Sequence, residues 1–254
     1  MAGTRALLGR DAMLLTLAWT AGIIDAVSYL GLGRVFTAMM TGNTVLLAMA
    51  VGQGELMAVL RSALALAGFS AGAVMGALIV ARGKTRGEWP PGVTAALAVE
   101  GILLGGVTVV WQLAGPARST GMTHLLIGLS GLAMGVQAAA VRHLGVPGVA
   151  TTYVTGTLTS LMADLVGWTR SLSASSSRAT STNQSAGDAS MNVNWQQRIG
   201  LLTGVFLVYA LGALVGGALE SRSSVLVTWL PFVSVAVVVA NGSARHIATR
   251  TASA

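Results

Sequence analysis

The sequence predicts an all-α, polytopic membrane protein with about six transmembrane helices, two short broken or re-entrant helices and two internal repeats. Three observations support this fold class. Of the 254 residues, 54% are hydrophobic and only 9% are charged, whereas a soluble domain carries about a quarter charged residues. The chain contains a series of long apolar segments. A polar Thr-Gly motif around Thr41 returns around Thr155. We therefore treat residues 1–254 as a single integral membrane domain.

The net charge of +7 arises from 15 Lys and Arg residues against 8 Asp and Glu residues. In a soluble protein this balance would suggest nucleic-acid binding. Here the basic residues fall between apolar segments, where they act as signals for membrane topology, and we expect no nucleic-acid partner. The chain has no Cys, which excludes disulfides and thiolate chemistry. The first apolar run lacks a signal-peptidase cleavage pattern and predicts a retained helix.

Eight apolar segments follow one another along the chain. They cover residues 12–32, 37–53, 57–81, 92–115, 121–141, 149–168, 199–219 and 224–241. A transmembrane helix needs about 20 apolar residues. The second and sixth segments, which hold the two Thr-Gly motifs, are short and begin with polar residues. This pattern is typical of broken or re-entrant helices.

Basic residues in the loops favour six crossings over eight. If all eight segments crossed from a cytoplasmic N-terminus, the loop with Arg82, Lys84 and Arg86 would lie outside the cell. If the second and sixth segments re-enter from the side they came from, this loop moves inside, as the positive-inside rule requires. Both termini are then predicted to be cytoplasmic.

The two Thr-Gly motifs predict a first repeat over residues 12–115 and a second over 121–241. Each repeat would contain three crossings. Because three is odd, the second repeat would be inverted relative to the first.

A second similarity extends the repeat. Gly72 and Gly76 in the third segment resemble Gly212 and Gly216 in the seventh, and we interpret both pairs as helix-packing motifs. Their separation exceeds that of the Thr-Gly motifs, which predicts a longer linker in the second half. Residues 169–197 are rich in Ser, Thr, Asn and Gln and are predicted to form a disordered cytoplasmic linker.

Asp25 is the sharpest single candidate, since a charge inside an apolar segment costs at least about 2.5–3.5 kcal/mol on insertion scales. It would serve as a proton- or cation-coupling carboxylate or bind a substrate amine. The alternative is a structural carboxylate bonded to backbone amides of the broken second segment. Gln137 lies near the equivalent place in the second half, and Glu100 is a second intramembrane carboxylate with the same two interpretations.

The Thr-Gly motifs supply the remaining candidates for a substrate-binding or coupling site. These are Thr37, Thr41, Gly42, Asn43 and Thr44 in the first motif, and Thr151, Thr152, Thr155, Gly156 and Thr157 in the second. Hydroxyls and exposed backbone groups at a helix break suit a small polar substrate or an ion. The alternative is helix packing through small residues.

Two arginines, Arg34 and Arg142, flank these motifs. Each would pair with a carboxylate or a substrate anion, or anchor the chain at the membrane interface, which is the commoner role. The three His residues have no metal-ligand spacing, and no nucleotide-binding or hydrolase signature is present. We therefore expect no catalytic residue, no metal, no cofactor and no enzymatic activity.

The chain resembles the bacterial YoaK-like membrane proteins, catalogued as domain of unknown function 1275. Three runs carry the resemblance: Ala21-Gly22-x-x-Asp25-Ala26, Leu32-Gly33-Arg34-Val35-Phe36-Thr37-Ala38-x-Met40-Thr41-Gly42-Asn43-Thr44, and Pro147-Gly148-Val149-Ala150-Thr151-Thr152-x-Val154-Thr155-Gly156-Thr157. The resemblance implies a protein of the bacterial plasma (inner) membrane with about six spans and no established activity. Met39 departs from the family pattern, which often has Asn there, so this position is not expected to supply a ligand.

The leading functional hypothesis is a small secondary transporter or permease-like protein, with a midplane site formed by both Thr-Gly motifs and Asp25. Its partners would be the lipid bilayer and a small polar solute or a proton. The alternative is a non-transporting membrane protein that acts in interaction or assembly. The sequence leaves the substrate and a homo-oligomeric state open.

Overall fold

The structure is a computed structural model that describes residues 8–83, 88–115, 117–149, 151–152, 154–177 and 185–252, without the side chains of 171–177, 185–194, 224 and 249–252. Within these ranges the chain is helical and contains no strand. The helices are α1 (Arg10–Gly31), α2 (Met40–Gln53), α3 (Leu56–Ala81), α4 (Pro91–Ala114), α5 (Thr120–His143), α6 (Val154–Ser177), α7 (Ser185–Glu220), α8 (Ser224–Val227) and α9 (Trp229–Ala252). The predicted all-α polytopic fold is confirmed.

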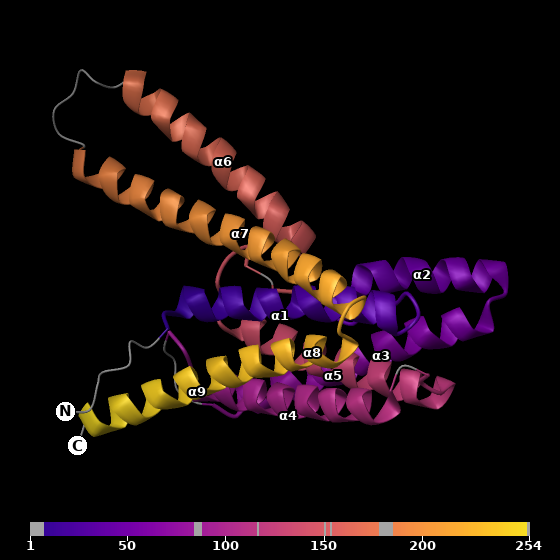
Figure 1. The fold of residues 1–254 in the computed structure, drawn as a ribbon. Coiled ribbons are helices and arrows are strands. Elements are labelled where there is room, and N and C mark those ends of the chain that lie inside the picture. Colours follow the sequence, from indigo (N-terminus) through magenta and orange to yellow (C-terminus); the bar gives the residue numbers. More distant parts are fainter. Residues whose placement is uncertain are drawn as a thin grey trace.

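Six helices of the described chain are long and apolar enough to cross a membrane. They are α1, α3, α4, α5, the part of α7 from Trp195 to Glu220, and the α8–α9 stretch from Val225 to Ala248. The α1 helix begins, and α9 ends, at the same end of the bundle (Figure 1). The two chain ends lie on the same side because the number of candidate membrane crossings is even.

Glycines bring α1 and α7 into backbone contact. A Cβ atom added at Gly22 of α1 would overlap the carbonyl oxygen of Tyr209 in α7. Conversely, a Cβ atom at Gly212 of α7 would overlap the carbonyl oxygen of Trp19. Membrane helices gain most of their association energy from such close packing, because lipid tails are as apolar as the side chains.

The α3 and α5 helices pack in the same way. A Cβ atom at Gly72 would overlap the carbonyl oxygen of Leu132, and one at Gly135 would overlap that of Phe69. Both predicted glycine motifs therefore lie at helix contacts, and their interpretation as packing motifs is confirmed.

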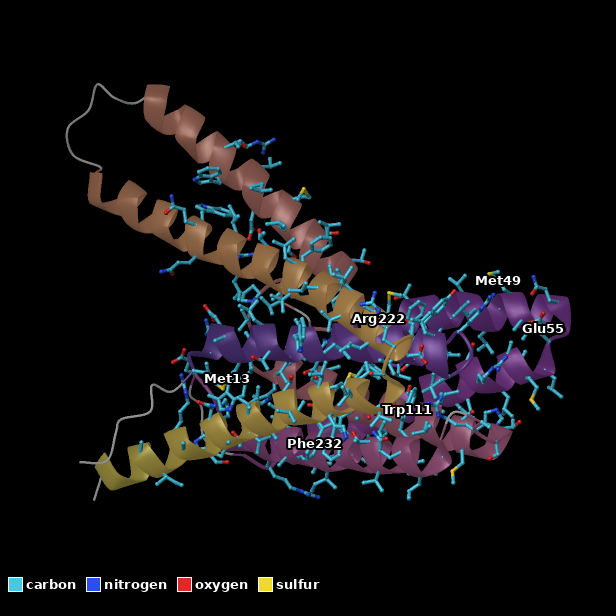
Figure 2. The ribbon with its side chains drawn as sticks, viewed as in Figure 1. Met13, Met49, Glu55, Trp111, Arg222 and Phe232 are labelled. Atoms are coloured by element: carbon cyan, nitrogen blue, oxygen red, sulfur yellow. The ribbon has the colours of Figure 1, made fainter. Side chains whose placement is uncertain are left out.

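The α4 and α9 helices complete the bundle. They pack on each other, while α4 also contacts α5 and α9 also contacts α1. The core between the helices contains Met13 and Trp111, which are buried, together with the partly buried Phe232 (Figure 2). At the end where α1 finishes, the Arg118 guanidinium lies 3.6 Å above the Trp111 ring.

The second predicted segment is a broken helix. After α1 ends at Gly31, the backbone turns through positive φ angles at Gly33 (87°) and Arg34 (63°), and α2 begins only at Met40. The helix is 14 residues long, ends at the left-handed Gly54 (φ 71°) and leads directly into α3. The α2–α3 hairpin, with Met49 and Glu55 near its tip, extends beyond the end of α1 (Figures 1 and 2).

The sixth segment differs from the prediction of a short helix, because α6 has 24 residues. It forms a hairpin with α7, in which the Arg198 Nε atom lies 2.9 Å from Asp164 Oδ2. Both helices continue into residues 169–197, which the sequence predicted as a disordered linker, up to Ser177 and from Ser185. Adding a residue to an existing helix costs little once the helix is nucleated, which accounts for this extension. Residues 178–184 lie outside the described residues.

We expect the substitution Gly72→Val to lower the free energy of unfolding by about 1–3 kcal/mol or more, because α3 and α5 have to separate to admit the side chain. Gly106→Val in α4 is the matched control, since a Cβ atom there has no neighbour within 4 Å. The measurement is unfolding of both purified variants in detergent. Equal stability of the two would contradict the packing role of Gly72.

Candidate functional site

The carboxylate of Asp25 binds the backbone just before the broken second helix. Its Oδ1 atom accepts hydrogen bonds from the backbone N–H groups of Thr37 (3.0 Å), Ala38 (2.8 Å) and Met39 (3.3 Å). Asp25 is only 3% exposed and lies six residues before the end of α1 at Gly31. The chain therefore folds back by about 9 Å, at 1.5 Å per residue, before α2 begins.

The second carboxylate oxygen of Asp25 binds α7. The Tyr209 hydroxyl donates a hydrogen bond of 2.6 Å to Asp25 Oδ2. One side chain of α1 thus joins the start of α2 to the middle of α7. All of these bonds are internal to the protein, which agrees with the structural interpretation of Asp25 weighed in the sequence.

Asn43 and Thr37 complete this cluster. The Asn43 amide pairs with both backbone groups of Phe36, accepting from its N–H at 2.9 Å and donating to its carbonyl. The hydroxyls of Thr37 and Ser28 lie 2.8 Å apart. Asn43 and Thr37 are fully buried, and the polar groups of this cluster form hydrogen bonds within the protein. We call Asp25, Ser28, Thr37, Asn43 and Tyr209 the Asp25 cluster.

Three of the candidate hydroxyl groups lie on the protein surface. Thr41, Thr44 and Thr155 are exposed on α2 and α6, and the Thr44 hydroxyl donates to the Met40 carbonyl of its own helix at 3.0 Å. Gly42 packs under the Phe36 ring, where an added Cβ atom would come within 3.0 Å. Gly42 therefore has a packing role, because a side chain at this position would collide with the Phe36 ring.

The second motif is built around Gln137 of α5. The Gln137 Nε2 atom donates to Thr151 Oγ1 (3.0 Å) and to the Leu17 carbonyl of α1 (3.1 Å). Gln137 and Thr157 are fully buried, and Thr151 is nearly so. Within the described residues, Gln137 Oε1 has no hydrogen-bond partner.

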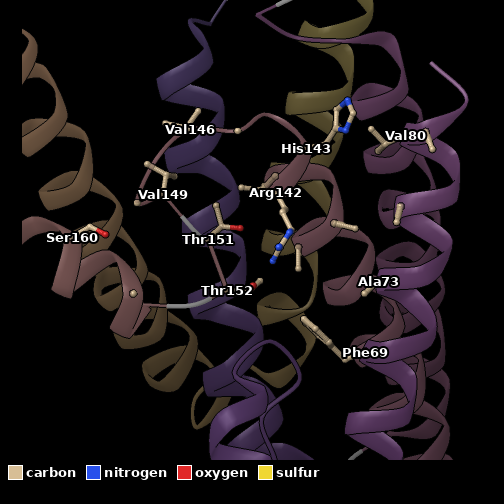
Figure 3. A pocket seen from close by; sticks show the side chains of 18 residues that line it. Phe69, Ala73, Val80, Arg142, His143, Val146, Val149, Thr151, Thr152 and Ser160 are labelled. Carbon is tan, nitrogen blue, oxygen red and sulfur yellow. The ribbon is translucent and has the colours of Figure 1, made fainter. Parts of the chain in front are cut away.

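The second motif opens onto a cavity of about 990 Å³. Its walls come from α3, α5, the segment between α5 and α6, and the first turns of α6. Eighteen residues line it, among them Phe69, Ala77, Arg142, Thr151, Thr152 and Ser160 (Figure 3). We call this space the α5–α6 cavity. The side chains of Arg142, Thr151 and Thr152 point toward the same part of it (Figure 3).

The two motifs lie toward opposite ends of the bundle. Asp25 is close to the end of α1 and Gln137 is close to the end of α5, while α2 and α6 extend in opposite directions (Figure 1). The structure therefore forms two separate clusters, whereas the sequence predicted one midplane site shared by both motifs. They are separate because each motif follows a helix that finishes at a different end of the bundle, α1 for the first motif and α5 for the second.

Glu100 belongs to neither cluster. It is fully buried in α4, and neither of its carboxyl oxygens has a hydrogen-bond partner among the described residues. A buried polar group without a partner is costly, so Glu100 stays a candidate for function. In the described part of the chain, no three His, Cys, Asp or Glu side chains gather where a metal ion would be held.

Sequence reasoning missed Tyr209 and Phe69. Tyr209 had a recognisable signal, because a phenol in the middle of an apolar segment normally finds a hydrogen-bond partner. Phe69 gave no signal, since one aromatic residue in an apolar helix is ordinary. Its place in the cavity wall depends on how α3 packs against α5.

Comparisons with known proteins give a family match. A family model described as "Protein of unknown function (DUF1275)" matches residues 13–241. The UPF0700 transmembrane protein YoaK of Bacillus subtilis (strain 168) is 41% identical over 158 residues, which cover 62% of this chain and 68% of that protein. No solved structure matches the chain. The match to a transmembrane protein and the six apolar helices support a membrane location.

The variant Tyr209→Phe is expected to lower the free energy of unfolding by about 1–3 kcal/mol, because it removes the hydrogen bond to Asp25 and leaves a buried oxygen unpaired. Tyr29→Phe is the control, since Tyr29 is 36% exposed. Unfolding in detergent compares the two variants. If Tyr209→Phe were as stable as the control, the hydrogen bond would contribute nothing to the fold.

Replacing Glu100 by Met is expected to leave the protein equally stable or to stabilise it by up to about 3 kcal/mol, because it removes unpartnered buried oxygens at similar volume. Gln137→Met is the matched control and should destabilise, because Gln137 loses two hydrogen bonds. A clear loss of stability in Glu100→Met would show that the carboxyl group has a structural partner.

Proposed function

Since the chain belongs to the DUF1275 family of proteins of unknown function, its activity has to be inferred from its own residues, and we propose that it is a small secondary transporter with two inverted halves. One observation carries the proposal. The first Thr-Gly motif is closed by a buried hydrogen-bonded cluster, whereas the second opens onto the α5–α6 cavity. Related halves in different states are what alternating access requires.

The helix contacts support a relation between the halves. If α1, α2, α3 and α4 correspond to α5, α6, α7 and α9, three packing contacts of the first half have counterparts in the second. These are α1 with α7 and α5 with α3, α2 with α3 and α6 with α7, and α4 with α5 and α9 with α1. The glycines follow the same scheme, because Gly22 faces the Tyr209 carbonyl as Gly135 faces that of Phe69. Tyr209 and Phe69 would therefore be equivalent.

Side-chain size accounts for the closed and open motifs. In the first half, Tyr29 stacks on Phe36 with ring centroids 5.0 Å apart, and Phe36 covers Gly42. In the second half, the alignment of Thr37 with Thr151 places Ala150 in the position that corresponds to Phe36 and His143 in the one that corresponds to Tyr29. The second motif therefore lacks the phenyl ring that covers the first.

In this proposal the Asp25 cluster acts as the closed gate. A charged carboxylate accepts stronger hydrogen bonds than a neutral one, so a proton on Asp25 would weaken its hold on α2 and α7. Opening of this gate, combined with closure of the α5–α6 cavity, would expose a solute to the other side of the membrane. The proposal includes no catalytic step and no cofactor.

The cavity lies at the end of the bundle where α1 begins, and Arg10, Arg82, Arg142 and Arg245 are at this end. By the positive-inside rule, we propose that this end is cytoplasmic and that the membrane is the bacterial plasma membrane.

One observation favours the alternative of a non-transporting membrane interaction protein. The Asp25 cluster is buried and bonded internally, as a purely structural helix break would be. The two proposals differ in whether water reaches the second motif, because a transport site needs an aqueous path and a packing motif does not.

Cysteine accessibility tests the proposal directly, since the chain has no Cys of its own. Ser160→Cys places a thiol in the α5–α6 cavity, and Ser28→Cys places one in the closed Asp25 cluster. Both substitutions exchange only oxygen for sulfur. In membrane vesicles we expect a charged, impermeant methanethiosulfonate reagent to label the Ser160→Cys protein at least about tenfold faster, because labelling needs water at the thiol.

A plugging variant provides the control. Ala77→Phe adds a ring at a residue that lines the cavity and should slow labelling of the Ser160→Cys protein. Ala71→Phe adds the same ring on another face of α3, outside this cavity, and should not. An unreactive thiol at position 160 in a folded protein would overturn the transporter proposal in favour of the alternative.

A further inference from the structure

We infer that the α5–α6 cavity selects a small organic anion, with a carboxylate-like head at Arg142 and an apolar body along α3. This inference rests on the proposed function, because it names the solute class that the proposed transport site would take. It comes from three features of the cavity: its charge, its hydroxyl donors and its apolar wall.

The charge of the cavity is positive. Arg142 lines it, and no Asp or Glu is among its lining residues. Within the described part of the chain, Arg142 has no ion pair, since the salt bridges there join Arg10 to Asp11 and Arg198 to Asp164. A guanidinium presents N–H groups in a fork that matches a carboxylate. An anion in the cavity would therefore find a charge partner that the protein itself does not use.

Thr151 is oriented to donate toward the same place. Its Oγ1 atom accepts the hydrogen bond from Gln137 Nε2 at 3.0 Å, so its hydroxyl hydrogen remains to be donated elsewhere. Figure 3 shows the Thr151 and Thr152 side chains directed to the part of the cavity that Arg142 enters. The α6 helix begins just beyond, and the N-terminal end of a helix also favours negative charge.

The α3 side of the wall is apolar. Phe69, Ala73, Ala77 and Val80 of α3 line it, and Ala138 of α5 adds a further methyl group. These side chains offer no partner for a second polar group and favour a short carbon chain or ring. A solute with one anionic end and an apolar body satisfies both parts of the cavity, whereas an inorganic ion or a sugar satisfies only one.

The test measures the preference of the cavity for negative charge. In a Thr152→Cys protein in phosphatidylcholine vesicles, the thiol is reacted with sulfonatoethyl methanethiosulfonate (anionic) and trimethylammonioethyl methanethiosulfonate (cationic). Each labelling rate is divided by the rate at which the same reagent reacts with free 2-mercaptoethanol, which corrects for the different intrinsic reactivity of the two reagents. We expect the anionic reagent to be favoured. Adding Arg142→Gln should lower the anionic-to-cationic ratio at least about fivefold, because the two reagents feel the removed charge with opposite sign.

Two further variants separate charge from structure. Arg142→Lys keeps the charge and should keep most of the ratio, and Arg222→Gln removes a charge at the opposite end of the bundle and should leave the ratio unchanged. Hexanoate, as a probe of the proposed class, should slow labelling of the Thr152→Cys protein. Hexanol and hexylamine, which match its carbon chain, should not.

The outcomes distinguish the two proposals. If neither reagent reaches position 152, the cavity is closed to water and the proposed transport function fails. If both reagents reach it but the ratio does not favour the anion, or does not respond to Arg142→Gln, the anion inference fails while the transport proposal stands. Equal protection by hexanoate and hexanol would show that the cavity takes apolar molecules irrespective of charge.

Discussion

Backbone amides at a helix break impose the strongest constraint on this fold. A chain segment that is not helical inside a bilayer has free N–H groups that no water can satisfy. In the segment just before α2, a single carboxylate oxygen accepts hydrogen bonds from three of them, at Thr37, Ala38 and Met39. Asp25 has to lie at this depth in α1, and Tyr209 has to reach it from α7. The fold-back of residues 32–39 and the placement of α7 against α1 both depend on this arrangement.

The second motif is held to the bundle by different chemistry. A neutral amide, Gln137, donates hydrogen bonds to the Thr151 hydroxyl and to a backbone carbonyl of α1, whereas the Asp25 carboxylate accepts backbone N–H groups. A neutral group is less expensive to bury than a charge. At the second motif the charged group is Arg142, which lines the adjacent α5–α6 cavity. The difference between the two ends is a difference in charge as well as in space.

Much of the fold could be predicted from the sequence, because its signals are local. Apolar length places the six spans, the polar start of residues 37–53 indicates the helix break, and the paired glycines mark close helix contacts. The candidate site was less predictable. Asp25 and the Thr-Gly motifs stand out as polar residues in apolar segments, but their grouping depends on which helices meet. Tyr209 and Phe69 come from helices distant in sequence, and the exposure of Thr41, Thr44 and Thr155 depends on the rotation of α2 and α6.

The glycine contacts between α1 and α7, and between α3 and α5, also determine which parts of the protein can move. Backbones that touch without side chains between them have little room to shift against each other, so we expect each pair to move as one body. Any change of shape would then occur between the pairs, where α4 and α9 pack against them. The α2–α3 hairpin would travel with α5, and the α6–α7 hairpin with α1. The mechanical unit of this protein is thus a pair of helices that come from different halves of the chain.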